Sequence, residues 1–383
     1  MRNTLIIVAL VLIMPVEGIF AQEVSPTNAD KQEVEQPVEV ANPKKKTKKK
    51  KLSAEELNQQ FFEAVEAGDQ ESVAASLDAM KYYQYNKDGE TALTLAIQQE
   101  NEEMVRKLVE AAVINLKNQE GETPLTLALK KKNTTIIQLV IKRAKAALKN
   151  DAGEAPLMLA MELNDLKLLQ TLIKKGADVN RKSNGVTPIA KATAMNNVKM
   201  VALLVRNGGD PSQANDDGDI PLYIAVRNGY NVISGILLHK SEQSGADANW
   251  KTEMGETLLN IAIEKGYEQV ARILLDFGAD IEGMDYMENT GLNIASEHGN
   301  IALVKLLLKQ GADFDHPNIM GTTPIMAAAQ KGHNELADLL AEEGANPSMR
   351  NFDGLAANDY GRFQRTSADE KIMDAVFELT EQQ

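Results

Sequence analysis

The chain has 383 residues, more than one ordinary globular core needs, and only 4% of them are aromatic. Compact enzymes usually carry more rings in their cores, whereas a chain of many small helices packed with aliphatic residues can do without them. The part after residue 52 has 32 Lys/Arg and 49 Asp/Glu, a net charge of −17, which disfavours nucleic-acid binding. The absence of cysteine excludes disulfides, thiolate zinc sites and a cysteine nucleophile.

Residues 1–21 have the three-part pattern of a secretory signal peptide. Arg2 gives the positive start, Leu5–Met14 is an unbroken apolar run of ten residues, and a short stretch after Pro15 ends at Ala21. Ten apolar residues are too few to span a bilayer comfortably, since about 20 are needed. We therefore expect cleavage after Ala21 and a periplasmic or secreted mature protein. The alternative is an uncleaved membrane anchor.

Residues 22–52 are predicted to be a disordered linker, because Gln22–Asn42 is polar and lacks a helical period. The linker ends in a lysine tract, which consists of Lys44, Lys45, Lys46, Lys48, Lys49, Lys50 and Lys51. Two interpretations of the tract stay open. It is either a solvated, self-repelling spacer or an electrostatic tether to an anionic surface such as lipid headgroups or envelope polymers, where each lysine contributes about 1 kcal/mol.

A period of about 33 residues organises the chain from residue 53 onward. The marker glycines are Gly89, Gly121, Gly153, Gly185, Gly218, Gly255, Gly321 and Gly354, separated by 32, 32, 32, 33, 37, 66 and 33 residues. Glu288 stands midway in the interval of 66. Two residues after these positions the chain reads Thr123-Pro124-Leu125 or a variant of it, and an Ala follows at a fixed offset. Such a period indicates an array of stacked supersecondary units.

The sequence of each unit predicts two helices and a hairpin. The Thr caps the first helix with its hydroxyl, Pro occupies the first helical position, and the Leu and Ala point into the stack. A second helix follows, such as residues 304–308, with apolar residues at i, i+3 and i+4. It ends at a glycine expected in the left-handed conformation, namely Gly176, Gly208, Gly245, Gly278, Gly311 or Gly344.

This pattern resembles the ankyrin repeat, whose 33-residue unit reads Gly-x-Thr-Pro-Leu-His-x-Ala, then a second helix, then Gly-Ala-Asp-x-Asn. The resemblance covers residues 53–383, about ten units, and implies an all-α fold, an α-solenoid. We expect a capping repeat at 53–86, regular repeats at 87–350 with extra residues near 240–244, and a C-terminal cap at 351–383. The family's His is absent, its positions being Thr94, Thr126, Met158, Ala190, Tyr223, Asn260, Asn293 and Met326. Because that His ties adjacent hairpins together, we expect a somewhat less rigid array.

The resemblance implies that a partner lies along the hairpin tips and first helices. In the second half the tips and their surroundings become apolar, and the candidate partner-binding residues are Trp250, Met254, Tyr286, Met287, Ile319, Met320 and Phe352. Met adapts to irregular surfaces, Tyr and Trp are favoured at binding hot spots, and an exposed apolar row normally marks an interface. The alternative is that neighbouring tips pack together and bury these side chains.

The motifs of common enzymes and metal sites are absent. There is no Gly-x-Ser-x-Gly and no phosphate loop, and none of the four histidines (His239, His298, His316 and His333) has an i, i+4 partner. We expect no catalytic residue, metal or cofactor, and a monomer that binds another protein. The predicted function is a non-enzymatic scaffold outside the cytoplasm. The alternatives are a secreted effector that binds a host protein, and an envelope-tethered spacer that uses the lysine tract.

Overall fold

The computed structural model of the protein describes residues 52–77, 85–239 and 245–360, all within one compact unit, Leu52–Gln383. The signal peptide, the lysine tract, the extra residues 240–244 and the end of the C-terminal cap lie outside the described residues. In the described part the secondary structure is helical apart from isolated bridges at Ser183–Val186 and Lys251–Thr257. The prediction of an all-α solenoid is confirmed.

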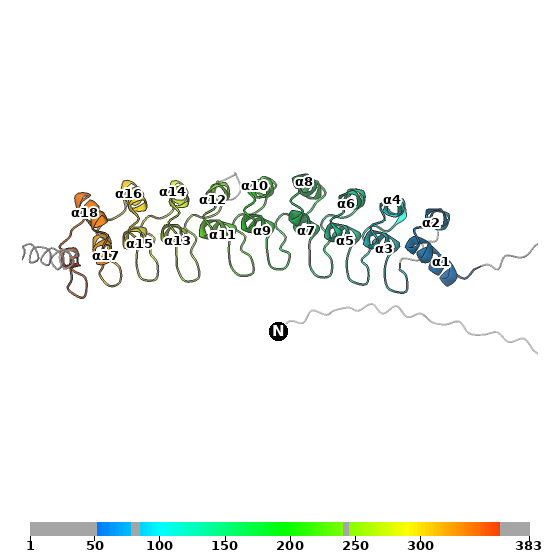
Figure 1. The fold of residues 1–383 in the computed structure, drawn as a ribbon, viewed down its shortest axis with the longest axis horizontal. Helices are drawn as coiled ribbons and strands as arrows, with labels where there is room; N and C mark the ends of the chain where they lie inside the picture. The colour runs from blue at the N-terminus through cyan, green and yellow to red at the C-terminus, as the bar shows by residue number, and fades with distance from the viewer. Residues whose placement is uncertain (1–51, 78–84, 240–244, 361–383) are drawn as a thin grey trace, which may run out of the picture. The chain divides into compact units, whose positions relative to one another are not determined.

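Eighteen described helices form nine successive pairs, which stack side by side with the hairpins projecting along one edge (Figure 1). The first helices of the pairs are α1 (Ala54–Glu66), α3 (Ala92–Gln98), α5 (Pro124–Lys131), α7 (Pro156–Glu162), α9 (Pro188–Ala194), α11 (Pro221–Arg227), α13 (Leu258–Glu264), α15 (Gly291–Glu297) and α17 (Pro324–Gln330). The second helices are α2 (Gln70–Ser76), α4 (Glu102–Ala111), α6 (Thr134–Ile141), α8 (Leu166–Lys174), α10 (Val198–Arg206), α12 (Asn231–Leu238), α14 (Glu268–Asp276), α16 (Ile301–Lys309) and α18 (Asn334–Glu342).

Threonine caps start most of the first helices after α1, as the sequence predicts. In α5 the Thr123 hydroxyl accepts a hydrogen bond from the backbone N–H of Thr126, and α3, α9, α13 and α15 begin in the same way. The prediction is wrong for Thr323, whose side chain makes no capping bond, although Pro324 still occupies the first helical position. The left-handed glycines are confirmed after five second helices, at Gly176, Gly208, Gly278, Gly311 and Gly344.

One continuous apolar core runs through the stack. The alanine at the fixed offset is fully buried in every regular unit, at Ala96, Ala128, Ala160, Ala192, Ala225, Ala262, Ala295 and Ala328. A side chain this small lets neighbouring helices approach closely, so a larger residue there overpacks the stack. Leucines from the second helices, such as Leu172 and Leu274, complete the core on the other side. Each unit therefore depends on its neighbours for burial.

Two asparagines replace the family's missing histidine. Asn260 donates through its side-chain amide to the Gly283 carbonyl at 2.9 Å, across to the next hairpin. Asn293 donates to the carbonyls of His316 and Thr322, both at 3.2 Å. In these two repeats an amide N–H therefore reaches the neighbouring hairpin, so a tie between hairpins is present without the His. Thr94 and Thr126 instead bond within their own helix caps. The lower rigidity of the array stays a prediction.

Candidate partner-binding surface

Neighbouring hairpins are joined at their tips by backbone hydrogen bonds. The Asp216 N–H donates to the Gly185 carbonyl at 2.9 Å, and the Ile319 N–H donates to the Met287 carbonyl at 3.0 Å. The Phe352 N–H donates to Met320 at 3.1 Å in the same way. These bonds hold the joined hairpins edge to edge, and the tips line up along one edge of the array as a platform.

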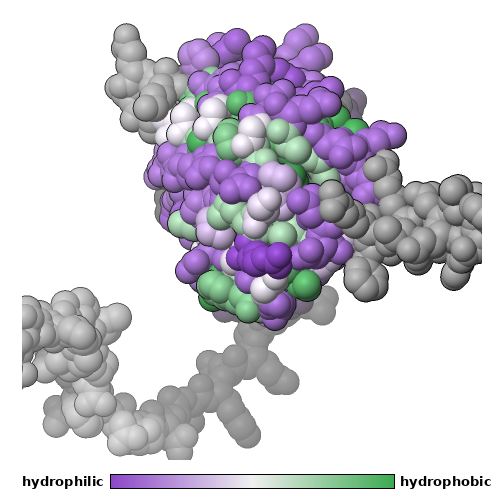
Figure 2. Space-filling model, turned by 90° about the vertical axis from the view of Figure 1, so that its left-hand side faces the viewer, coloured by the Kyte–Doolittle hydropathy of each residue, from purple (hydrophilic) through white to green (hydrophobic). Residues whose placement is uncertain are grey.

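Five of the seven predicted partner-binding residues are exposed on this platform. We call them the tip row: Met254 (72% exposed), Tyr286 (67%), Ile319 (45%), Met320 (48%) and Phe352 (80%). The other two are half-buried, and the Trp250 ring packs against Tyr223 with centroids 5.4 Å apart. Seen from the C-terminal end of the stack, apolar groups reach the surface at the hairpin edge, at the bottom of the view (Figure 2).

The tips of the first half carry ion pairs in addition to such backbone bonds. Lys117 pairs with Asp151 of the next hairpin at 2.5 Å, and Lys182 pairs with Asp216 at 2.8 Å. Both aspartates are largely exposed, so each pair adds little stability. The contrast between the halves is therefore in what the tips offer to a partner: paired charges in the first half, and uncovered apolar side chains in the second.

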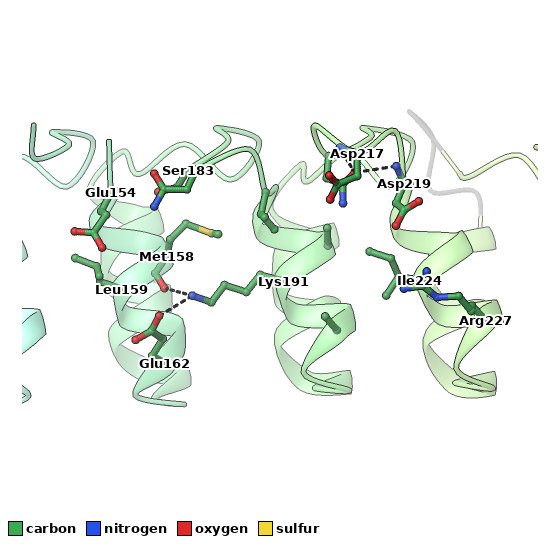
Figure 3. A pocket seen from close by; sticks show the side chains of 15 residues that line it. Glu154, Met158, Leu159, Glu162, Ser183, Lys191, Asp217, Asp219, Ile224 and Arg227 are labelled. Carbon is green, nitrogen blue, oxygen red and sulfur yellow. Dashed lines mark hydrogen bonds and ion pairs between the residues drawn. The ribbon is translucent and has the colours of Figure 1, made fainter. Parts of the chain in front are cut away.

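A hollow of about 500 Å³ lies between the hairpins and the first helices α7, α9 and α11 (Figure 3). Its floor is formed by Ala190 and Ala194 of α9, between the longer side chains Met158 and Glu162 of α7 and those of α11. In every other regular repeat a longer Gln, Lys, Glu or Arg stands where α9 has Ala194. The hollow, which we call the α9 hollow, therefore exists because α9 has alanines at two positions where the neighbouring first helices have larger side chains.

The rim of the α9 hollow is charged. The Lys191 ammonium bridges to the Glu162 carboxylate at 2.8 Å and to the Met158 carbonyl at 3.3 Å, as Figure 3 shows. On the hairpin side the Asn215 side chain accepts hydrogen bonds from the backbone N–H groups of Asp217 and Asp219, which fixes the turn that carries both carboxylates. The hollow thus combines an apolar floor with an acidic hairpin rim. The hollow was not predicted from the sequence, although Ala190 and Ala194 are the small residues at their two positions when α9 is aligned with α7 and α11.

Comparison with protein families gives the identity of the repeat. The family model described as ankyrin repeats (3 copies) matches seven overlapping segments, at residues 61–150, 111–183, 133–215, 157–249, 189–285, 235–318 and 284–351. The chain belongs to the ankyrin-repeat family. No curated protein matches the chain. Ankyrin repeats are generally protein–protein interaction modules, and proteins built from them are typically non-enzymatic scaffolds.

A partly exposed charge cluster joins the hairpin bases of two neighbouring repeats near the N-terminal end of the ankyrin array. Lys130 lies 2.5 Å from Glu122 and 2.6 Å from Glu154, and Asn150 donates to both carboxylates. The Lys130 hydrogen bond, followed by that of Asn150, lowers the pKa of Glu154. Burial lowers the pKa of Lys130, but the hydrogen bonds to Glu122 and Glu154 outweigh it, so that this pKa is raised. These shifts come from ion pairing that joins two consecutive repeats, which gives the cluster a structural role.

Two of the histidines also have structural partners. A ring nitrogen of His298 lies 2.8 Å from the Ile294 carbonyl of its own helix. His333 precedes α18, and its Nε2 lies 3.1 Å from the Glu297 carbonyl of the preceding repeat. Among the described residues no group of three or more His, Asp or Glu is arranged to hold a metal ion. A helix long and apolar enough to cross a membrane is likewise absent from the described part of the chain.

Proposed function

We propose that this ankyrin array is a non-enzymatic scaffold that captures a partner protein through the tip row and the adjoining first-helix face. The observation that carries the proposal is the exposure of five large apolar side chains on consecutive hairpins of the second half. Each such side chain contributes about 1.5 to 3 kcal/mol when a partner buries it fully. Apolar rows of this kind on soluble proteins normally mark an interface.

The α9 hollow supports the same proposal from the first-helix side. Its alanine floor accepts a protruding apolar side chain, and the carboxylates of Asp217 and Asp219 on the rim favour a neighbouring basic residue of the partner. A partner that contacts both the tip row and the hollow follows the hairpin edge across several repeats. Such an extended surface suits a macromolecule better than a small substrate.

We further propose that the chain acts outside the cytoplasm. The support is the pattern of residues 1–21, with its single basic residue, apolar run and small residue at the expected cleavage point. Full-length protein expressed in bacteria should be exported and shortened by 21 residues, whereas a chain that starts at Gln22 should stay inside. An N-terminus that remains at Met1 after export would instead favour the membrane anchor.

A structural spacer is the second candidate, because the seven lysines before the array suit attachment to an anionic envelope surface. Neutralising the tract, with all seven lysines replaced by Gln, separates the two functions. A spacer loses its localisation and has no partner that depends on the tip row. A scaffold keeps its partner through the tip row, whether or not its localisation changes.

The decisive test replaces Tyr286, Ile319 and Phe352 with Ser and measures partner capture by quantitative affinity pulldown. Only side chains change, so the backbone bonds between tips remain and the melting temperature should stay within a few degrees. We expect the captured partner to fall at least about tenfold, since three buried apolar anchors are lost. Capture at the unmodified level by a folded triple variant would refute the proposal.

A matched control carries three Ser substitutions on polar tips of the first half that lie outside the α9 hollow, Lys87→Ser, Gln119→Ser and Glu120→Ser. These residues occupy tips of the same geometry. We expect the control to retain at least half of the capture. Equal losses in the two variants would mean that tip substitution damages the array in general, and that the tip row has no special role.

A further inference from the structure

The net charge of the array changes sign along the chain, with one basic section between two acidic sections. Residues 123–206 have 15 Lys/Arg and five Asp/Glu, a net charge of +10, within a chain whose net charge is −14. On either side, residues 53–122 have five Lys/Arg and 15 Asp/Glu, and residues 207–360 have nine and 24. We call residues 123–206 the basic section. The overall charge of the array conceals it.

Four of these cations lie on the second helices α8 and α10, which belong to the layer on the edge of the array opposite the hairpin tips (Figure 1). Helices α8 and α10 contain no acidic residue, and their side chains Lys167, Lys174, Lys199 and Arg206 are exposed. None of these four makes an ion pair with another described residue. Their positive charge is therefore available to an external anion.

A groove of about 380 Å³ lies between α8 and α10, lined by three of these four cations. Its floor is apolar, with Leu166 from α8 and Val198 and Leu203 from α10, and all three are only half-buried. Its rim carries Lys167, Lys199 and Arg206, together with the amide of Gln170. A recessed apolar floor under a cationic rim requires a ligand that offers both apolar groups and negative charge.

We propose that this α8–α10 groove binds an acidic amphipathic helix of a protein partner. Apolar side chains at i, i+3 and i+4 of such a helix reach Val198 and Leu203, and flanking carboxylates pair with Lys167, Lys199 and Arg206. A flat membrane surface presents its charge at the rim but does not reach the recessed floor. A duplex offers phosphates without apolar groups and meets acidic sections on both sides. The helix is therefore the ligand that uses both features of the groove.

The probe for the test is a fluorescent 18-residue helical peptide with Leu at i, i+3 and i+4 and Glu on the flanks of that stripe. Binding to the purified full chain is followed by fluorescence anisotropy at low and physiological salt. We expect saturable binding that weakens as salt is added, because the contacts of the rim are screened. A peptide in which every Glu is replaced by Gln should bind much more weakly.

Charge reversal tests the rim. The variant K167E/K199E/R206E should weaken peptide binding at least about tenfold, because three attractive contacts become repulsive. The matched control K265E/K305E/K309E makes the same change in net charge at exposed lysines of the 207–360 section and should bind within about twofold of the parent. Equal binding by the two variants overturns the proposal.

Leu203→Gln tests the floor without changing charge, and it also decides the matter if the charge-reversed chain does not fold. We expect this folded variant to weaken the peptide by about fivefold or more, since an apolar contact is replaced by a buried amide. Unchanged binding would show that the rim alone attracts anions and would overturn the proposal. Binding of phosphatidylglycerol vesicles or a 20-base-pair DNA without binding of the peptide would overturn it as well.

Discussion

Asn293 connects two hairpins that carry the tip row, and its removal gives a sharp prediction for stability. The residue is 2% exposed. Its amide donates to His316 and Thr322 of the next hairpin, and its oxygen accepts from the Thr290 N–H at 3.0 Å and the Thr290 hydroxyl at 2.7 Å. Asn293→Ala therefore removes four hydrogen bonds in one substitution and leaves buried backbone groups without partners.

The expected cost is about 3 kcal/mol, taking close to 1 kcal/mol for each neutral bond and allowing for weak geometry in the two longer ones. Asn260 occupies the same position in the preceding repeat but makes one good bond, to Gly283, and one marginal bond at 3.5 Å. Its oxygen is buried and accepts none. Asn260→Ala should therefore cost only about 1 kcal/mol.

Urea unfolding followed by circular dichroism measures the two losses, and hydrogen exchange locates them. Since repeats contact only their neighbours, the extra exchange in Asn293→Ala should be confined to residues near 290–323. Equal destabilisation by the two substitutions, or a loss below about 1 kcal/mol for Asn293→Ala, would refute the assignment of inter-hairpin bonding to this residue.

Further predictions concern pH, backbone and oxidation. Because the folded pKa of Glu154 lies below its ordinary 4.5, chiefly through the Lys130 hydrogen bond, its stabilisation is present above about pH 4.5 and is lost as pH falls through the folded pKa. The melting-temperature advantage over Glu154→Gln should therefore shrink steadily as the pH is lowered below 4.5. Gly321→Ala should cost about 1 kcal/mol more than Gly354→Ala in urea unfolding: both glycines have φ +76°, but only at Gly321 does a new Cβ meet the next hairpin tip, at 3.2 Å. Under dilute peroxide, Met254 should oxidise before the fully buried methionines of the core, as peptide mass spectrometry would show.

The fold could be predicted from the sequence because the same local signals recur many times along the repeats. A Pro after the cap, an Ala at a fixed offset and a glycine after the second helix each follow from local chemistry, and all appear in the structure. The hydrogen bonds between neighbouring hairpins could not be predicted in the same way. Whether Asn293 replaces a histidine depends on which carbonyls of the next hairpin lie within reach, and that distance is set by stacking across units.

The candidate surface was only partly predictable. The sequence identified apolar tips, but the difference between Phe352, which is exposed, and Trp250, which packs on Tyr223, depends on where each side chain points. The charges of the basic section are visible in the sequence, but the net charge of the whole array is negative and conceals them. The α8–α10 groove needed the structure, because only stacking brings Leu166 beside Leu203.

The two proposed surfaces lie in different layers of the array, and this separation predicts that they work independently. The tip row is on the hairpin edge of the second half, whereas the α8–α10 groove is in the layer of second helices. Coupling between two binding sites requires a structural element that has two arrangements, and each ligand must favour one of them. In a stack whose repeats contact only their neighbours, such a rearrangement stays local and does not link the two surfaces. The variant K167E/K199E/R206E should therefore capture the tip-row partner as well as the parent does. A matching loss of capture would mean that one partner spans both layers, with the acidic helix as part of it.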